Sequence, residues 1–375
     1  MNLTRRSLFA VPAALTLAGP GLARAQAPAP ATEQARAVVR AYMAAAPFPA
    51  ASVAVWHGGG LVWTEAFGVA DLETGVPATT EDRFRLASVS KVLTAAAVMR
   101  LVARRVVDLD APISRYRPSL PSPHRETSLR QLVSHQGGVR HYIPRDFDPA
   151  APGGSIDTRT YLTTDDKLAI FINDPLVSPP GEAVNYSTFG YVLIGAVLEA
   201  AAGRPFPDIL AETVTAPLAL SSIEPEVRGV IRPGRVGDYQ PVYPIKAQVE
   251  IVRCPPINPA YKWAGGGLLG SAPDVARFCG ALTQPGYLSA DGLSALFTAN
   301  PSRSGATGVF GVGWDIDRDP KGRRRGWHAG SIVGGRSIVM MLPDDGVAVA
   351  MLTNLGQVDV DPLVPAQRIA DAFLG

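Results

Sequence analysis

Hydrophobic and polar positions along this chain change their period twice, which divides it into three parts. Near the N-terminus, residues 33–46 have the spacing of an amphipathic helix. Two β-rich runs follow at 51–56 and 61–68, separated by His57-Gly58-Gly59-Gly60, a sequence typical of a hairpin. The first part therefore predicts one helix and two neighbouring strands.

The middle of the chain has mainly helical patterns. Helices are predicted at 128–134, 164–173, 188–202 and 206–213. Residues 225–259 are rich in Pro, Gly, Val and Ile without clear periodicity. That stretch predicts a long connection, and such connections often form lids or pocket walls.

The last third returns to strands. A helix is predicted at 272–282, with Asp274 in its first turn. The elements expected after it are strands at 308–317, 324–328, 334–342 and 347–354 and a terminal helix at 363–374.

This order of elements predicts an α/β (α+β) fold. Strands from both ends of the chain form one antiparallel sheet flanked by helices, and the middle forms a helical subdomain. We expect the sheet subdomain at about 33–85 and 262–375 and the helical subdomain at about 86–261, within one domain over 26–375. The junction between them is the natural place for an active site.

Composition excludes several classes of function. A hydrophobic content of 47% with 18% charged residues indicates a globular protein. The net charge of +2 gives no electrostatic case for nucleic acid as a partner. No Cys/His spacing of the zinc type occurs, so neither a metal nor another cofactor is expected.

Residues 1–25 have the pattern of a twin-arginine export signal. Arg5-Arg6 precedes an apolar run at 8–18, and Ala23-Arg24-Ala25 offers a cleavage site before Gln26. The alternative is a short amphipathic helix that stays attached. The signal predicts a periplasmic protein, and no later apolar run is long enough to cross a membrane.

The sequence does not decide whether Cys254 and Cys279 form a disulfide. The periplasm permits one, but their predicted positions in a loop and a helix do not favour it.

Ser88-Val89-Ser90-Lys91 introduces an apolar stretch at 92–102. A serine and a lysine three residues apart share one helix face, with Cβ atoms roughly 5–6 Å apart. Lysine is rare in this chain (Lys91, Lys167, Lys246, Lys262 and Lys321), and a buried lysine, unlike arginine, can lose its proton. The pair could therefore form a nucleophile with its own base. The structural alternative is a helix N-cap serine followed by a snorkelling lysine.

Two further motifs complete a pattern with this pair. They are Tyr186-Ser187-Thr188 and Trp327-His328-Ala329-Gly330-Ser331. In this order and spacing the chain resembles the serine β-lactamase-like hydrolases, which include class C β-lactamases, D,D-peptidases, D-aminopeptidases and esterases. It is most similar to their mitochondrial type, through Ser134-His135-Gln136-Gly137-Gly138-Val139-Arg140-His141-Tyr142 and the Tyr-Ser-Thr variant.

The resemblance implies a role for each matching residue. Ser88 is the nucleophile, Lys91 its base, and Tyr186 relays the proton, while His328 stands where the family motif has lysine. The backbone N–H groups of Ser88 and Ser331 form the oxyanion hole. The residues expected to contact a small-molecule or peptide substrate are Ser187, Thr188, Ala329, Gly330, His141 and Tyr142.

Two of these positions depart from the family pattern. Thr188 replaces an asparagine, and His328, which we expect to titrate near neutral pH as a partial cation, replaces a permanently charged lysine. Both changes predict weak β-lactamase activity at best and favour esters, amides or D-residue peptides as substrates. Gly330 is expected to let the substrate approach the strand closely. A penicillin-binding acyl trap or sensor, a true β-lactamase and an inactive scaffold remain as alternatives, and the sequence leaves the oligomeric state open.

Overall fold

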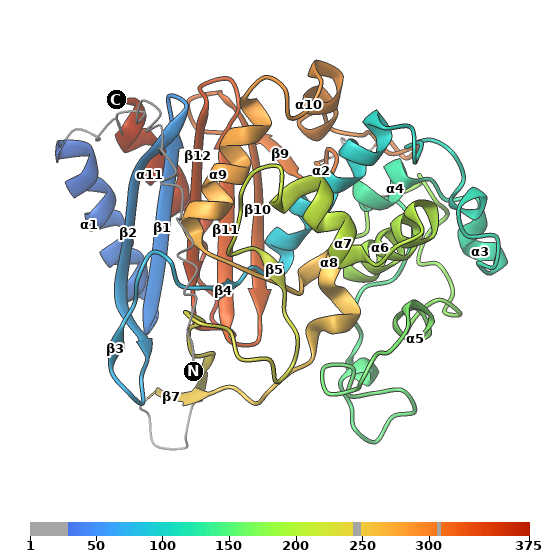
Figure 1. Cartoon of the computed structure of the whole chain (residues 1–375), viewed down its shortest axis with the longest axis horizontal. Coiled ribbons are helices and arrows are strands. Elements are labelled where there is room, and N and C mark those ends of the chain that lie inside the picture. The colour runs from blue at the N-terminus through green and yellow to red at the C-terminus, as the bar shows by residue number, and fades with distance from the viewer. Residues whose placement is uncertain (1–28, 243–248, 306–308) are drawn as a thin grey trace, which may run out of the picture.

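A seven-stranded antiparallel sheet forms one side of the molecule in the computed structural model, which describes residues 29–242, 249–305 and 309–375 (Figure 1). The predicted export signal lies outside the described residues. The strand order is β3-β2-β1-β12-β11-β10-β9, so β1, from near the N-terminus, pairs with β12, from near the C-terminus. The strands are β1 (Ala50–His57), β2 (Gly60–Asp71), β3 (Val76–Pro77), β9 (Asp315–Arg318), β10 (Arg324–Ile332), β11 (Gly335–Leu342) and β12 (Val347–Thr353).

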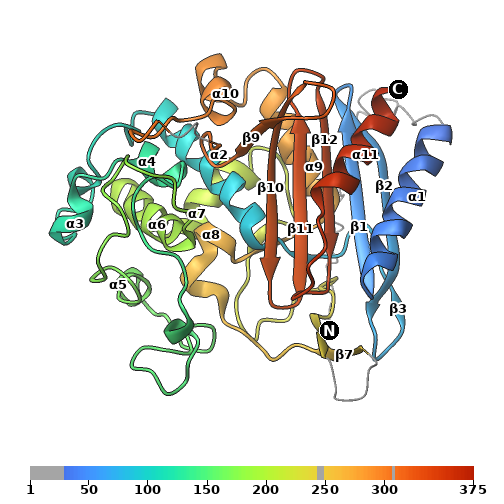
Figure 2. The same ribbon diagram turned by 180° about the vertical axis from the view of Figure 1, so that it is seen from behind.

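Helices cover both faces of this sheet. Helices α1 (Ala29–Ala45) and α11 (Leu363–Leu374) lie across one face (Figure 2), and α9 (Ala272–Thr283) lies across the other (Figure 1). Side chains alternate along a strand, so Val53 and Val55 of β1 pack with the terminal helices, whereas Ala54 packs in the core that contains α9. Because both faces are buried, the central strands are apolar at nearly every position.

The helical lobe stands beside the sheet and is built around two buried helices, α2 (Ser90–Ala103) and α6 (Thr188–Ala202). Both are apolar on nearly all sides, as helices in the middle of a core must be. The other helices are α3 (Ser122–Arg125), α4 (Leu129–Val133), α5 (Thr164–Leu168), α7 (Phe206–Leu210), α8 (Trp263–Gly266) and α10 (Ala290–Leu296). The remaining strands are β4 (Phe84–Arg85), β5 (Glu224–Pro225), β6 (Tyr239–Val242), β7 (Glu250–Arg253) and β8 (Leu268–Gly270). No helix within the described residues is both long and apolar enough to span a membrane.

The predicted fold class is confirmed, but local expectations differ from the structure: α5 ends at Leu168 instead of 173, and β10 runs to Ile332 instead of 328. The strand expected at 308–317 is limited to β9 (Asp315–Arg318), because Val312 and Gly313 bond to the helical lobe instead of to a strand. The N–H of Val312 donates to the Ala295 carbonyl, and that of Gly313 donates to the Val133 carbonyl. The connection expected at 225–259 contains the paired strands β6 and β7.

Cys254 and Cys279 do not form a disulfide. Both are buried as free thiols, Cys254 just after β7 and Cys279 within α9. Burial raises the pKa of both thiols, to about 11 for Cys254, so neither is a ready nucleophile.

Candidate active site

Ser88 lies in a 3₁₀ turn, Ala87–Val89, between β4 and α2. Ala87 has a φ of 47°, a left-handed conformation that costs free energy for a residue with a side chain. Hydrogen bonds hold the turn on both sides. Ser337 Oγ donates to the Leu86 carbonyl at 2.7 Å, and the Leu86 N–H donates to the Leu268 carbonyl at 2.9 Å. The serine is therefore presented from a fixed, strained turn.

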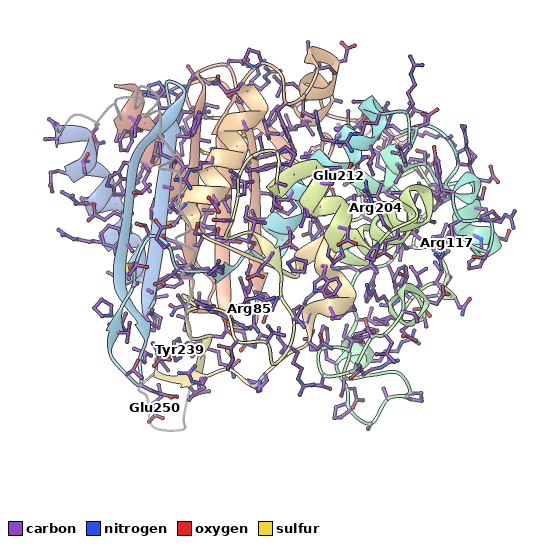
Figure 3. The ribbon with its side chains drawn as sticks, viewed as in Figure 1. Arg85, Arg117, Arg204, Glu212, Tyr239 and Glu250 are labelled. Atoms are coloured by element: carbon purple, nitrogen blue, oxygen red, sulfur yellow. The ribbon has the colours of Figure 1, made fainter. Side chains whose placement is uncertain are left out.

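Arg85 anchors the strand that leads into this turn (Figure 3). Its guanidinium is almost fully buried and forms a bidentate ion pair with Glu226, at 2.8 and 2.6 Å. It also donates to the Val333 carbonyl, just after β10, at 2.7 Å. A buried ion pair of this kind fixes geometry more than it adds stability. Arg85 thus ties β4 to the far end of β10.

Three of the four residues predicted to be catalytic lie together, since Lys91 and Tyr186 are each within hydrogen-bond distance of Ser88, and His328 is the fourth. Ser88 Oγ is 3.0 Å from Lys91 Nζ, and the Tyr186 hydroxyl donates to Ser88 Oγ at 2.8 Å. Lys91 comes from the first turn of α2, and Tyr186 lies two residues before α6. The serine oxygen thus has a possible proton acceptor and a possible proton donor within hydrogen-bond distance.

Lys91 is fully buried, and burial holds its pKa well below the ordinary value, with the charge of Lys262 lowering it further. Its Nζ lies 2.5 Å from the Gly265 carbonyl and 3.2 Å from Thr188 Oγ1. A neutral amine has two N–H bonds and one lone pair. When the two N–H groups donate to Gly265 and Thr188, the lone pair faces Ser88.

Tyr186 is a protonated phenol, because burial raises its pKa above the ordinary value. Its ring packs against that of His135, with centroids 4.4 Å apart and the ring planes tilted by 35°. As the phenol donates to Ser88 in the resting site, the group able to take a proton from the serine is Lys91.

Two histidines bond to consecutive amides at the start of α6. The N–H of Ser187 donates to His135 Nδ1 at 3.1 Å, and the N–H of Thr188 donates to His141 Nδ1 at 3.2 Å. Each histidine therefore carries its proton on Nε2. Burial lowers the pKa of both, to about 4 for His141. His141 lines the cavity beside Ser88, whereas His135 is buried behind Tyr186.

Ser187 has a structural role at the start of α6. Its Oγ donates to the Arg140 carbonyl at 2.7 Å and accepts from the Gly190 N–H at 2.9 Å, which makes it the N-cap of α6. It is 3% exposed and does not line the cavity. The start of the helix uses this side chain, and the expected contact with substrate stays a prediction.

His328 is not the partial cation that was expected. It is 2% exposed, and its Nδ1 donates to the Ala329 carbonyl at 2.9 Å. Burial, with a smaller effect from Lys91, lowers its pKa to about 3. His328 is therefore neutral throughout the physiological range and supplies no charge to the site. Its ring lies behind Tyr186, with centroids 6.2 Å apart.

His328→Gln should make the protein less sensitive to acid. Between pH 6.5 and about 3 the imidazole binds a proton only in the unfolded chain. The contribution of the buried neutral imidazole to the free energy of unfolding is therefore fully present above pH 6.5 and is lost as pH falls. From pH 7 to pH 5 this loss amounts to about 2 kcal/mol in the free energy of unfolding. Urea unfolding at both pH values should show that the variant loses about 2 kcal/mol less than the wild type.

Asp315 acts in the opposite direction over part of this range. Burial, followed by the charge of Asp317, raises its pKa to about 7, so it favours the folded state more as pH falls. Because Asp315 is present in both proteins, its contribution cancels in the comparison. Equal losses in the two proteins would show that His328 is not held neutral.

The two residues around Gly330 line the cavity, but Gly330 itself does not. A Cβ at Gly330 would lie 2.2 Å from Ser337 Oγ and 2.8 Å from the Leu86 carbonyl. The glycine therefore lets β10 approach the turn that holds Ser88, and its expected role in the close approach of substrate stays a prediction. Ala329 and Ser331 line the cavity. The oxyanion hole expected from the N–H groups of Ser88 and Ser331 stays a prediction.

The cavity at Ser88 has a volume of about 330 Å³, the size of a small-ligand site. The sheet side contributes Ala329, Ser331 and Ile332, and the helical side contributes His141, Tyr142 and Thr188. Its lining residues are Ala87, Ser88, His141, Tyr142, Tyr186, Thr188, Lys262, Gly265, Gly266, Ala329, Ser331 and Ile332. Across the described parts of the chain, no group of three His, Cys, Asp or Glu side chains could hold a metal ion.

Lys262 is a site residue that the sequence analysis did not predict, whereas His135, which the resemblance places at the pocket with His141 and Tyr142, is buried behind Tyr186 and does not line the cavity. Lys262 could have been noticed through the rarity of lysine, since it is one of only five in the chain. His135 belongs to a family-like segment, but its packing against Tyr186 depends on a contact across 51 residues of sequence, which no local pattern reveals.

Comparison with known proteins gives a consistent result. The family model described as Beta-lactamase matches residues 35–373. The chain is 26% identical to the mitochondrial serine beta-lactamase-like protein LACTB of Homo sapiens, over 84% of this chain and 74% of that protein. It is 31% identical to Esterase EstB of Burkholderia gladioli, over 74% of this chain and 78% of the esterase.

Solved structures support the fold. The D-amino acid amidase of Ochrobactrum anthropi superposes with a TM-score of 0.75 at 22% identity, covering 91% of this chain and 98% of the amidase. A D-stereospecific amidohydrolase from Streptomyces sp. superposes with a TM-score of 0.74 at 23% identity, with the same coverages.

Proposed function

Since the chain belongs to the beta-lactamase family of serine hydrolases, we propose that it cleaves esters, amides or D-residue peptides through a covalent acyl-enzyme on Ser88. One observation carries the proposal. The Ser88 oxygen lies within 3.0 Å of the amine of a lysine that burial keeps neutral, and it accepts a hydrogen bond from a protonated tyrosine. That arrangement can remove one proton and deliver another without a histidine or a metal.

Acylation begins when Lys91 takes the Ser88 hydroxyl proton and the oxygen attacks the substrate carbonyl. The N–H groups of Ser88 and Ser331 stabilise the resulting oxyanion. Tyr186 protonates the leaving alcohol or amine and regains a proton from the Lys91 ammonium. In deacylation a water attacks the ester, its proton passes to the same pair, and Ser88 leaves as the hydroxyl.

Two features disfavour efficient hydrolysis of β-lactams. Thr188 has no amide to hold an acylamino group, and its hydroxyl is already engaged with Lys91. His328 is buried and neutral, so it cannot attract the carboxylate that a motif lysine would. The similar proteins include an esterase and D-specific amidases, which supports ester and amide substrates.

Mass spectrometry of the purified protein tests this function. Incubation with p-nitrophenyl valerate should add one acyl group at Ser88, with a burst of nitrophenol followed by steady release. A chromogenic β-lactam should give little turnover. A stable adduct with no release from either reagent would identify an acyl trap, and absence of any adduct would contradict the acyl-enzyme.

We also propose that the protein is exported to the periplasm. The support is the sequence pattern of residues 1–25, above all Arg5-Arg6 before the apolar run. Cell fractionation should find the protein in the periplasm, and Arg5→Lys with Arg6→Lys should retain it inside the cell. Equal distribution of the two proteins would contradict the signal.

A further inference from the structure

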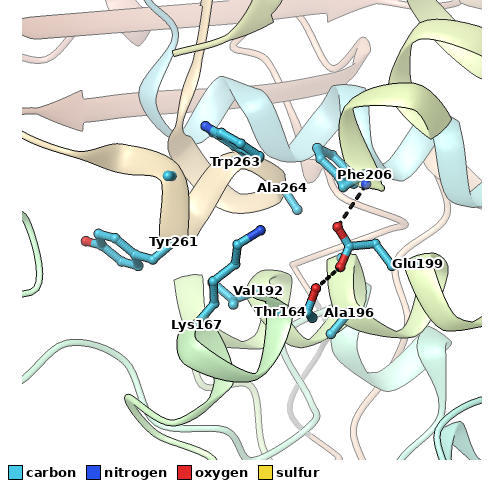
Figure 4. Close-up of a pocket in the computed structure, with 11 residues that line it drawn as sticks. Thr164, Lys167, Val192, Ala196, Glu199, Phe206, Tyr261, Trp263 and Ala264 are labelled. Carbon is cyan, nitrogen blue, oxygen red and sulfur yellow. Dashed lines mark hydrogen bonds between the residues drawn. The ribbon is translucent and has the colours of Figure 1, made fainter. Parts of the chain in front are cut away.

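The segment from Tyr261 to Gly266 separates two cavities and alternates between them. Lys262, Gly265 and Gly266 line the cavity that contains Ser88. Tyr261, Trp263 and Ala264 line a smaller hollow that contains Lys167 (Figure 4). Lys262, within this segment, thus lies in the cavity that contains Ser88 (the reaction cavity), and Lys167 lies in the other one.

Lys262 is held in place but keeps donors available. It is 7% exposed, and its Nζ lies 3.6 Å from Asp157 Oδ1. The rings of Tyr142 and Tyr261 lie 5.5 and 5.1 Å from the nitrogen, a geometry that stabilises a cation. Burial lowers its pKa, and Asp157 opposes that shift.

Asp157 leaves part of the ammonium unsatisfied. It is the one carboxylate among the described residues within 4.0 Å of the Lys262 nitrogen, and it also accepts a hydrogen bond from the Tyr261 hydroxyl at 3.0 Å. An ammonium has three N–H donors. A group entering the cavity can therefore meet donors that the protein does not use.

The remaining lining of the cavity is uncharged. His141 is neutral because its pKa is about 4, and burial raises the pKa of the phenols of Tyr142 and Tyr186. No Asp or Glu is among the described residues that line the cavity. Lys262 is close enough to Ser88 and Lys91 for its charge to lower the pKa of Lys91. Lys262 is therefore the one cationic side chain among the described residues that line this cavity, and its partner Asp157 lies outside the lining.

We propose that Lys262 binds a carboxylate of the substrate, and that the preferred substrates are esters or amides carrying a carboxylate near the scissile bond. The inference rests on the proposed function. In this scheme the positive charge comes from Lys262, the residue directly before α8, and not from β10, where the family motif has its lysine. Lys262 is a specificity residue in this scheme and takes no part in proton transfer.

Matched ester pairs test the proposal. For a carboxylate on the acyl side, p-nitrophenyl hemiglutarate is compared with p-nitrophenyl valerate. For one on the leaving group, 3-carboxyphenyl acetate is compared with 3-carbamoylphenyl acetate. In at least one pair the wild type should favour the carboxylated ester by 10-fold or more in kcat/KM, the order of one charge-assisted hydrogen bond.

Variants assign this preference to Lys262. Lys262→Met should bring the ratio within each pair close to 1, and Lys262→Arg, which keeps the charge, should retain most of the preference. Lys167→Met is the matched control, because that lysine also lies over an aromatic ring, Trp263 at 4.8 Å, but in the other cavity. Its ratios should equal those of the wild type.

Further outcomes separate this proposal from the proposed function. Hydrolysis of the neutral esters without a carboxylate preference, or a preference that survives Lys262→Met, overturns the anion site and leaves the acyl-enzyme intact. Failure to cleave any of the four esters contradicts the proposed function itself. Should Lys262→Met not fold, inhibition of the wild type decides: glutarate should compete with p-nitrophenyl valerate and neutral glutaramide should not. Equal inhibition by both overturns the site.

Discussion

Ser88→Ala is expected to reduce turnover of p-nitrophenyl valerate by at least about 10³-fold while the protein stays folded. The hydroxyl oxygen is the atom that both Lys91 and Tyr186 face, so no other side chain can replace it as nucleophile. Steady-state kinetics measures the loss, and mass spectrometry should find no acyl adduct. Removal of the Ser88 hydroxyl should lower the free energy of unfolding by about 1 kcal/mol, because the hydrogen bonds of one hydroxyl are lost.

Ser222→Ala is the matched control for this experiment. Ser222 is also buried, and its hydroxyl donates to Asp274 at 2.7 Å, away from the cavity. That variant should lose stability on a similar scale and keep its turnover. If Ser88→Ala kept its activity, or if both variants lost it equally, the nucleophile assignment would be wrong.

The elements with strong local signals could be predicted from the sequence. Helix α6 has the predicted bounds, because Ser187 caps its start and Gly203 ends it in the left-handed conformation, with a φ of 68°. Helix α11 has the predicted bounds too. The strand expected at 308–317 was wrong because tertiary partners, the carbonyls of Ala295 and Val133, take the N–H groups of Val312 and Gly313.

The site divides in the same way. Ser88 and Lys91 share a helix face, so their proximity follows from spacing alone. The placing of Tyr186 needed the resemblance, since it lies 98 residues from Ser88. The prediction that His328 is partly charged was wrong, because burial decides its protonation. The strand pattern of the sequence does not reveal that this position in β10 is buried. Lys262 reaches the cavity only through the packing of the segment before α8.

Lys91→Met is expected to reduce kcat/KM by at least about 10³-fold without destabilising the fold by more than about 2 kcal/mol. Methionine has nearly the shape of lysine and suits a fully buried position, but it has no lone pair that can take the serine proton. Ester kinetics measures the loss of activity, and urea unfolding measures the stability. The wild-type rate should rise with pH through a pKa below the ordinary 10.5 of lysine, because only the neutral amine accepts a proton.

Lys91→Arg separates the base from the charge. A guanidinium stays protonated in a protein, so this variant restores a cation beside Ser88 without restoring a proton acceptor. It should be as inactive as Lys91→Met and should not show the rise of rate with pH. Near-normal activity in Lys91→Arg would mean that a positive charge suffices at this position. The base would then be another group, with Tyr186 the nearest candidate, since its hydroxyl is 2.8 Å from the serine oxygen.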